Sequence, residues 1–253
     1  MSENKIILAV GAHPDDIEFL CAGTLALLKD KGWKIHLATM TPGDKGSVEH
    51  TSEEIAAIRK KEAAESASLL DAGYDCMEGE DLFLFYNKEM ITRVTKLIRM
   101  VKPTIVFTMS PIDYHVDHEI SSKIVVTACF SAGVKLLETE GAEAFDEIPY
   151  LYYMDPLDGR DNFGKEIKPA IIVDISAKID LKKEMLACHS SQREWLRKHH
   201  GVDEYIITMK NISSERGKMI NKKYGEGFRQ HLGHAFPQDD ILKKELNGMV
   251  YTI

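Results

Sequence analysis

The chain alternates short apolar runs with amphipathic segments, and this alternation constrains its fold more than any other feature. Three apolar runs are typical of strands buried on both faces: residues 5–11, 34–40 and 104–109. Segments with apolar residues at helical spacing follow them, and Thr51 with Glu54 forms the pattern of a capping box before one such segment. The alternation predicts a Rossmann-like, three-layer α/β sandwich with a mostly parallel central sheet.

The second half of the chain continues this pattern less regularly. We expect a helix over about residues 118–137, strands at 151–154 and 170–176, and a long helix over about 180–199. The run YIITM at 205–209 is rich in β-branched residues, which favours a last strand before a final helix. The aromatic-rich segment 136–160 suits either a pocket wall or a subunit contact. The length of 253 residues predicts one domain spanning residues 1–253.

Composition restricts the partners and the compartment. The net charge of −8 argues against nucleic acid as a partner, because no basic stripe is available to neutralise phosphates. No apolar run reaches the roughly 20 residues of a membrane-spanning helix, and the N-terminus has no signal-peptide pattern. Four isolated cysteines predict free thiols in a reducing, cytoplasmic location: Cys21, Cys76, Cys129 and Cys188.

Two polar clusters follow the predicted strands at residues 5–11 and 104–109, which are the first and the fourth when a weak third strand near residues 74–78 is counted. The first cluster is His13-Pro14-Asp15-Asp16, and the second is the His-Val-Asp-His run at residues 115–118. In a doubly wound sheet the fourth strand returns to lie beside the first, and a ligand crevice opens at the carboxyl ends of both strands. The topology therefore predicts that the two clusters meet at that crevice, although about 100 residues separate them.

The residue types in these clusters favour a catalytic metal site. His13 and Asp16 are three residues apart at a strand-to-helix turn, and both are good zinc ligands. Either His115 or His118 would complete a three-ligand set, which leaves an open position for water as in catalytic zinc sites. A remaining carboxylate would then act as general base, and the remaining histidine would stabilise an oxyanion or protonate a leaving group.

Each cluster also has a simpler explanation. Aspartates after a strand commonly cap a helix N-terminus, and a lone H-x-D-H run is compatible with a solvated loop. The occurrence of both clusters beside the predicted crevice favours the metal site over these explanations.

The segments GAHPDDIE, PIDYHVDH and KKEMLACHSSQ together give the sequence a resemblance to a known family. It resembles the LmbE-like, or PIG-L, zinc-dependent N-acetylglucosaminyl deacetylases over nearly its whole length. The resemblance implies an LmbE-like fold and removal of acetyl groups from N-acetylglucosamine-type sugars. It also implies a Zn²⁺ cofactor, with Fe²⁺ as the alternative in the cell, and a homo-oligomer, a trimer or a hexamer.

The resemblance assigns a role to particular residues. It implies that zinc binds to His13, Asp16 and His118, that Asp15 is the general base, and that His115 stabilises the oxyanion and helps the amine to leave. Asp117 would orient His115. The same resemblance places Arg59 at the substrate or the product acetate, and it places His189 and Gln192 near the pocket as substrate-binding candidates. A solvated helix face is the simpler explanation of Arg59, and a packed core histidine is the simpler explanation of His189.

Two other functions compete with N-deacetylation of a sugar. The same metal site would serve hydrolysis of another amide or removal of a larger acyl group, and pocket size would separate these reactions. A Rossmann-like binding protein for a nucleotide or methyl donor is the third hypothesis. The first turn argues against it, because the glycine fingerprint is absent and two carboxylates there would repel a pyrophosphate.

Overall fold

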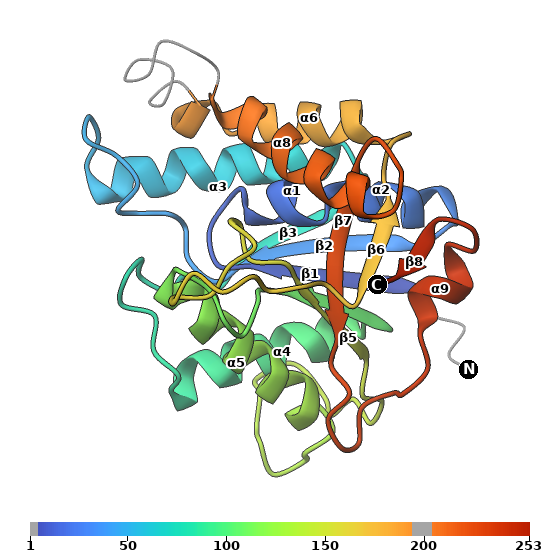
Figure 1. Cartoon of the computed structure of the whole chain (residues 1–253). Helices are drawn as coiled ribbons and strands as arrows, with labels where there is room; N and C mark the ends of the chain where they lie inside the picture. Colours follow the sequence, from blue (N-terminus) through green and yellow to red (C-terminus); the bar gives the residue numbers. More distant parts are fainter. Residues whose placement is uncertain (1–4, 194–203) are drawn as a thin grey trace.

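The computed structural model describes residues 5–193 and 204–253, which build one eight-stranded sheet covered by helices on both faces (Figure 1). The strands are β1 (Ile6–Gly11), β2 (Lys34–Thr39), β3 (Gly73–Cys76), β4 (Ile105–Thr108), β5 (Tyr150–Met154), β6 (Ile171–Asp174), β7 (Gly225–Gln230) and β8 (Val250–Thr252). The helices are α1 (Asp16–Leu20), α2 (Ala22–Asp30), α3 (Ser52–Ser68), α4 (Lys88–Val101), α5 (Val116–Ser131), α6 (Ile179–Ala187), α8 (Glu204–Met219) and α9 (Ile241–Glu245).

The strand order is β3-β2-β1-β4-β5-β7-β6-β8, so the fourth strand lies beside the first as the sequence predicts. The strands from β3 to β5 are parallel, and the pairs that involve β7, β6 and β8 are antiparallel. In the register of β1 and β4, Val10 is opposite Thr108. The carboxyl ends of these two strands are therefore adjacent, and the segments that follow them leave the sheet at the same edge.

The two faces of the sheet bury separate hydrophobic clusters. One cluster packs side chains of the sheet against α1, α2, α6 and α8, and the other packs the opposite face against α4 and α5. Figure 1 shows these helices in two layers, one above and one below the sheet. This arrangement confirms the predicted α/β sandwich, and the predicted capping box of Thr51 and Glu54 is present at the start of α3.

Two sequence predictions in the second half are wrong. The YIITM run is not a strand: it forms the first turns of α8, because Tyr205 and Met209 are one helical turn apart and both pack into the core. The predicted helix over 180–199 ends at Ala187. After a break at Cys188 and His189, residues 190–193 are helical again, and Glu62 accepts hydrogen bonds from the backbone N–H and the hydroxyl of Ser191. Residues 194–199 of that prediction lie outside the described residues.

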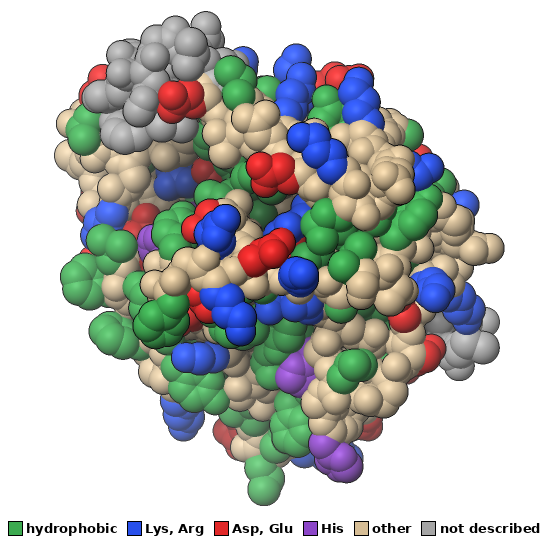
Figure 2. Space-filling view, viewed as in Figure 1, with side chains coloured by type: hydrophobic (Ala, Val, Ile, Leu, Met, Phe, Trp, Pro, Cys, Tyr) green, Lys and Arg blue, Asp and Glu red, His purple; other side chains and the backbone are tan. Residues whose placement is uncertain are grey.

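The surface carries mixed charge. Figure 2 shows Lys and Arg side chains interspersed with Asp and Glu over the visible face. Within the described ranges, no helix combines the length and the apolar character that crossing a membrane requires.

A buried ion pair joins β7 to the helical layer above it. Glu226 on β7 lies 2.7 Å from the ammonium of Lys182 on α6, and both side chains are almost fully buried. The same carboxylate accepts the backbone N–H groups of Gly23 and Thr24 at the start of α2, at 2.9 and 2.7 Å. A carboxylate at a helix N-terminus satisfies donors that have no partner within the helix. Glu226 therefore holds two helices and one strand together.

Glu226→Ala should lower the free energy of unfolding by about 3–5 kcal/mol, because it leaves the Lys182 ammonium buried without a counter-charge. Urea denaturation followed by circular dichroism measures the change. Glu65→Ala is the control, since it breaks the exposed pair of Lys61 and Glu65 and should have little effect. A loss no larger than that of the control would show that Glu226 does not hold the layers together.

Candidate metal centre

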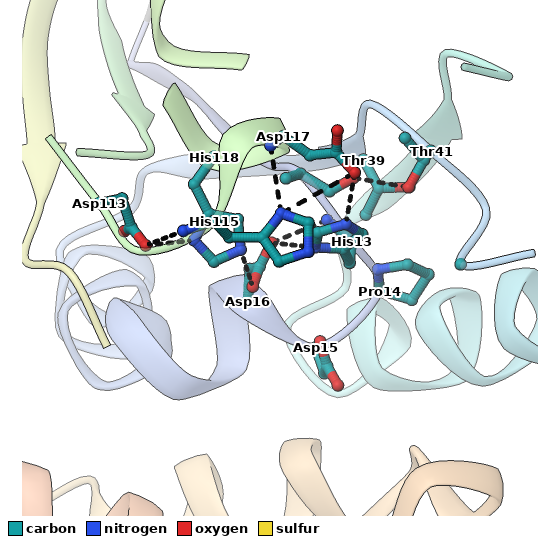
Figure 3. A network of polar contacts seen from close by, with 12 residues as sticks. His13, Pro14, Asp15, Asp16, Thr39, Thr41, Asp113, His115, Asp117 and His118 are labelled. Atoms are coloured by element: carbon teal, nitrogen blue, oxygen red, sulfur yellow. Dashed lines mark hydrogen bonds and ion pairs between the residues drawn. The ribbon is translucent and has the colours of Figure 1, made fainter. Parts of the chain in front are cut away.

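The turn between β1 and α1 presents three polar side chains in different directions. Asp15 is the N-terminal cap residue of α1 and has φ 108° and ψ −23°, a conformation that residues other than glycine rarely adopt. Such a conformation costs about 1–3 kcal/mol and is concentrated at functional sites. It turns Asp15 away from its neighbours: Figure 3 shows its side chain directed away from the group that contains His13 and Asp16.

Asp16 lies between one histidine from each cluster. Its Oδ2 atom is 3.6 Å from His13 Nδ1, and its Oδ1 atom is 3.4 Å from His118 Nε2. The ligand atoms of His13, Asp16 and His118 all lie within 4.8 Å of one another. The structure thus brings together the three residues that the sequence singled out as metal ligands, from the ends of β1 and β4.

A second group consists of His13, His115 and Asp117, whose ligand atoms also lie within 4.8 Å of one another. His13 Nε2 lies 3.2 Å from Asp117 Oδ2. His115 Nδ1 is 3.9 Å from that oxygen and accepts the backbone N–H of Asp117 at 3.1 Å instead. The rings of His115 and His118 stack with their centroids 5.0 Å apart (Figure 3).

The charges around these histidines suit a cation. Burial lowers the pKa of His118, but Asp16 and Asp113 outweigh burial and raise it to about 10. Burial likewise opposes the shift at His13, where Asp117 and Asp16 raise the pKa to about 9. The carboxylates therefore hold positive charge on both rings. A divalent ion would supply that charge in place of the protons, and two imidazoles with one carboxylate are an ordinary zinc donor set.

Asp15 lies in a separate buried environment on the other side of the turn. Its Oδ2 atom accepts a hydrogen bond of 2.5 Å from the hydroxyl of Tyr205 and lies 3.5 Å from Arg59 Nη2. Burial raises the pKa of Asp15, and the guanidinium of Arg59 partly opposes this shift. Sequence reasoning did not single out Tyr205, because it treated the YIITM run as a strand. The four-residue spacing of the buried Tyr205 and Met209 is the signal that would have placed it on a helix.

Arg59 is 5% exposed and supports two loops of the site. Its Nη2 group donates to the carbonyl oxygen of Pro14 at 2.7 Å, and its Nη1 group donates to that of Gly43 at 3.4 Å. Gly43 has φ +76°, and a side chain there would collide with the guanidinium. The loop after β2 that contains Gly43 therefore packs directly on Arg59.

His189 and Gln192 lie behind the site rather than at its surface. His189 is fully buried, with its Nε2 atom 3.3 Å from Glu18 Oε1. Gln192 donates to the carbonyl oxygen of Gly46 at 2.8 Å. Of these residues only Gly46 lines the cavity described next.

A cavity of about 480 Å³ opens over the turn and lies within the range of small-molecule sites. Its walls come from both halves of the chain: His13, Asp15, Asp16, Phe19, Lys45, Gly46, Arg59, Asp81, Leu82, Tyr114, His115, His118, Leu157, Glu204, Tyr205 and Thr208. Leu157 belongs to the aromatic-rich segment of the sequence, so part of that segment forms a pocket wall. The candidate ligands and the candidate base face the same cavity.

This fold, with a His/Asp ligand group at the carboxyl edge of its sheet, defines a class, the metal-dependent deacetylases of LmbE-like fold. Residues 8–129 match the model of the PIG-L family, which is described as GlcNAc-PI de-N-acetylase. That match covers β1 to α5 and both polar clusters.

Individual relatives extend the similarity over most of the chain. Diacetylchitobiose deacetylase of Thermococcus kodakarensis is 26% identical over 238 residues, 89% of this chain and 82% of that protein. The structure of N,N'-diacetylchitobiose deacetylase from Pyrococcus horikoshii with its inhibitor MPG aligns with a TM-score of 0.76 at 26% identity, covering 94% of this chain and 89% of that one. A 4-oxalmesaconate hydratase of Pseudomonas putida is 25% identical over 247 residues, 92% of this chain and 90% of the hydratase. Proteins similar to this chain are therefore named for more than one reaction.

The buried pair of Glu18 and His189 predicts a pH-dependent stability. Burial opposes ionisation of both groups, but their mutual attraction raises the pKa of His189 above 6.5 and lowers that of Glu18 below 4.5. The His189 contribution is fully present below pH 6.5 and is lost as the pH rises through the raised pKa. The Glu18 contribution is present above pH 4.5 and is lost as the pH falls through the lowered pKa.

The pair should therefore stabilise the fold most between about pH 4.5 and 6.5. Urea denaturation of the wild type and His189→Gln across pH 4–9 measures this contribution. The difference between the two proteins should shrink as the pH rises above 6.5. A difference that stays constant up to pH 9 would contradict the assigned ion pair.

Proposed function

We propose that the protein is a zinc-dependent N-deacetylase that removes the acetyl group from an N-acetylglucosamine-type sugar or glycoside. One observation carries the proposal: the His13–Asp16–His118 group and the carboxylate of Asp15 face one cavity. The match to the PIG-L family model and the similarity to diacetylchitobiose deacetylase support the choice of substrate.

In this proposal His13, Asp16 and His118 hold the ion, which is Zn²⁺ or, in the cell, Fe²⁺. Both metals accept imidazole and carboxylate ligands. A bound divalent ion supplies Lewis-acid chemistry, since it polarises a carbonyl group and lowers the pKa of water to about 7.

Asp15 would take the proton of the attacking water. Burial raises the pKa of this partly buried carboxyl group, and a more basic carboxylate is a better general base. Tyr205 and Arg59 fix the carboxylate from the side opposite the histidines. Arg59 would also contribute positive charge at the substrate.

His115 would stabilise the oxyanion and give a proton to the departing amine. Burial lowers its pKa, and neighbouring His13 and His118 lower it further. Its Nδ1 atom accepts the N–H of Asp117, so the other ring nitrogen, Nε2, is the one that carries a proton for donation. Asp117 thus orients His115 through its backbone. His189 and Gln192 would act on the substrate indirectly, through Glu18 and the loop at Gly46.

Two alternative reactions use the same residues. The cavity of about 480 Å³ exceeds the needs of an acetyl group, so an amide with a larger acyl group would also fit. The second alternative is the addition of water to a double bond, which the similarity to a 4-oxalmesaconate hydratase suggests. Asp15 as a proton acceptor is compatible with either reaction, and the products distinguish them.

Acetate release from a panel of N-acetylglucosamine derivatives tests the proposal. Zinc-loaded protein is compared with chelator-treated protein, with N-butanoyl analogues and 4-oxalmesaconate in parallel assays. Release of acetate that depends on the metal establishes the deacetylase. Faster release of the larger acyl group would replace the deacetylase with an amidohydrolase for longer acyl chains. Consumption of 4-oxalmesaconate alone would replace the deacetylase with a hydratase.

We also propose a cytoplasmic homo-oligomer. All four cysteines are free, as a reducing compartment requires. Several large apolar side chains cluster in one exposed loop near the cavity: Leu82, Phe83, Phe85 and Tyr86. Burial of this loop against another copy would remove apolar surface from water. Light scattering gives the mass in solution, and a monomer would contradict the proposal.

Asp15→Asn should lower turnover about 10²–10⁴-fold, because the amide cannot accept the proton of the attacking water. Asparagine tolerates the left-handed backbone at this position, so the turn and the zinc content should be preserved. Acetate release and zinc content by atomic spectroscopy measure the two effects. Asp75→Asn is the control, because Asp75 pairs with His36 away from the cavity. A variant that keeps wild-type turnover would place the base elsewhere.

A further inference from the structure

Each of the two candidate ligand histidines lies between Asp16 and a second carboxylate. His118 has Asp16 at its Nε2 atom and Asp113 Oδ1 at its Nδ1 atom, 3.0 Å away. His13 has Asp16 near its Nδ1 atom and Asp117 Oδ2 near its Nε2 atom, 3.2 Å away. Asp113 and Asp117 thus occupy corresponding places behind the two rings (Figure 3).

We propose that Asp113 is a positioning residue for the metal centre and acts together with Asp117. With the ion bound, Asp113 would accept the Nδ1–H of His118 and leave Nε2 for the ion. Asp117 would likewise accept the Nε2–H of His13 and leave Nδ1 for the ion. This inference rests on the metal ligands of the proposed function. A carboxylate on the second nitrogen of a ligand histidine fixes the tautomer and makes the ring a stronger ligand.

The surroundings of Asp113 favour this role over a surface ion pair. Its side chain is 1% exposed, and its Oδ1 atom also accepts the backbone N–H of His115 at 3.2 Å. Its own backbone N–H donates to Glu119 Oε1 at 3.2 Å. The contact with His118 has ion-pair distance, although the N–H direction is not aligned for a full hydrogen bond. Burial and these hydrogen bonds hold the carboxylate beside the ring.

Asp117 supports His13 more directly than it supports His115. Its Oδ2 atom accepts the backbone N–H of Leu82 at 2.7 Å and faces His13 Nε2, while His115 Nδ1 is 3.9 Å away. His115 Nδ1 is already engaged by the backbone of Asp117. The group of His13, His115 and Asp117 therefore supports the first ligand group and is not a second ion site, and one ion per chain is expected.

Three measurements test the proposal on the full-length chain: the zinc dissociation constant by chelator competition, turnover at saturating zinc, and long-range ¹H–¹⁵N spectra of histidine-labelled protein. The variants are Asp113→Ala and Asp113→Asn, with His118→Ala as the reference for a lost ligand. Asp155→Asn is the matched control, since Asp155 is also a buried aspartate with one unpartnered oxygen but bonds to Arg216.

Asp113→Ala should weaken zinc binding about 10- to 100-fold, and turnover at saturating zinc should change much less. Asp113→Asn should lose less affinity, because its amide oxygen can still accept the Nδ1–H of His118. Asp155→Asn should bind zinc as the wild type does. In the zinc-loaded wild type, the spectra should show His118 protonated on Nδ1.

A proton on His118 Nε2 in the zinc-loaded wild type would overturn the inference, and this readout requires no variant to fold. Unchanged zinc affinity in Asp113→Ala would overturn the inference alone, and the proposed function would stand. A wild-type chain that binds no zinc would overturn both the role of Asp113 and the proposed function. Two zinc ions per chain would refute the supporting role given to Asp117.

Discussion

The carboxylate of Asp16 lies between two imidazoles from distant parts of the chain, and the rest of the site is arranged around this contact. His13 arrives at the end of β1 and His118 in the first turn of α5, after β4. Their approach depends on the pairing of β1 with β4, which places Val10 opposite Thr108. A sheet in which other strands separated β1 from β4 would hold the same residues without bringing the two histidines to one carboxylate.

The site concentrates features that oppose folding. Asp15 has an unfavourable backbone conformation, and several carboxylates are buried with one oxygen unpartnered. Each feature carries a free-energy cost that the surrounding structure must offset. Arg59 contributes by bonding to the carbonyl oxygen before Asp15, and Tyr205 contributes by donating to its side chain. The separate hydrophobic clusters on the two faces of the sheet supply the remaining stability.

Sequence patterns predicted the first half of the molecule well because the signals there are local. Apolar runs of strand length and the capping box at Thr51 depend on neighbouring residues, and the crevice follows from the strand order. The strand predicted at 205–209 failed because β-branched residues favour strands only weakly, whereas packing of Tyr205 and Met209 against the core decides in favour of helix. The role of Asp113 depends on which nitrogen of His118 it faces, and spacing along the chain does not contain that information.

The contribution of Tyr205 shows how the chemistry is divided along the polypeptide. Residues 8–129, which match the family model, carry the candidate metal ligands, Asp15 and Arg59. The partner of Asp15 and part of the cavity wall come from Leu157 and the start of α8, outside that match. The candidate metal ligands and part of the cavity wall therefore come from different parts of the chain. Substitutions in the later segments would change the cavity wall and leave the candidate metal ligands in place. Such a division would let related chains of this fold act on different compounds.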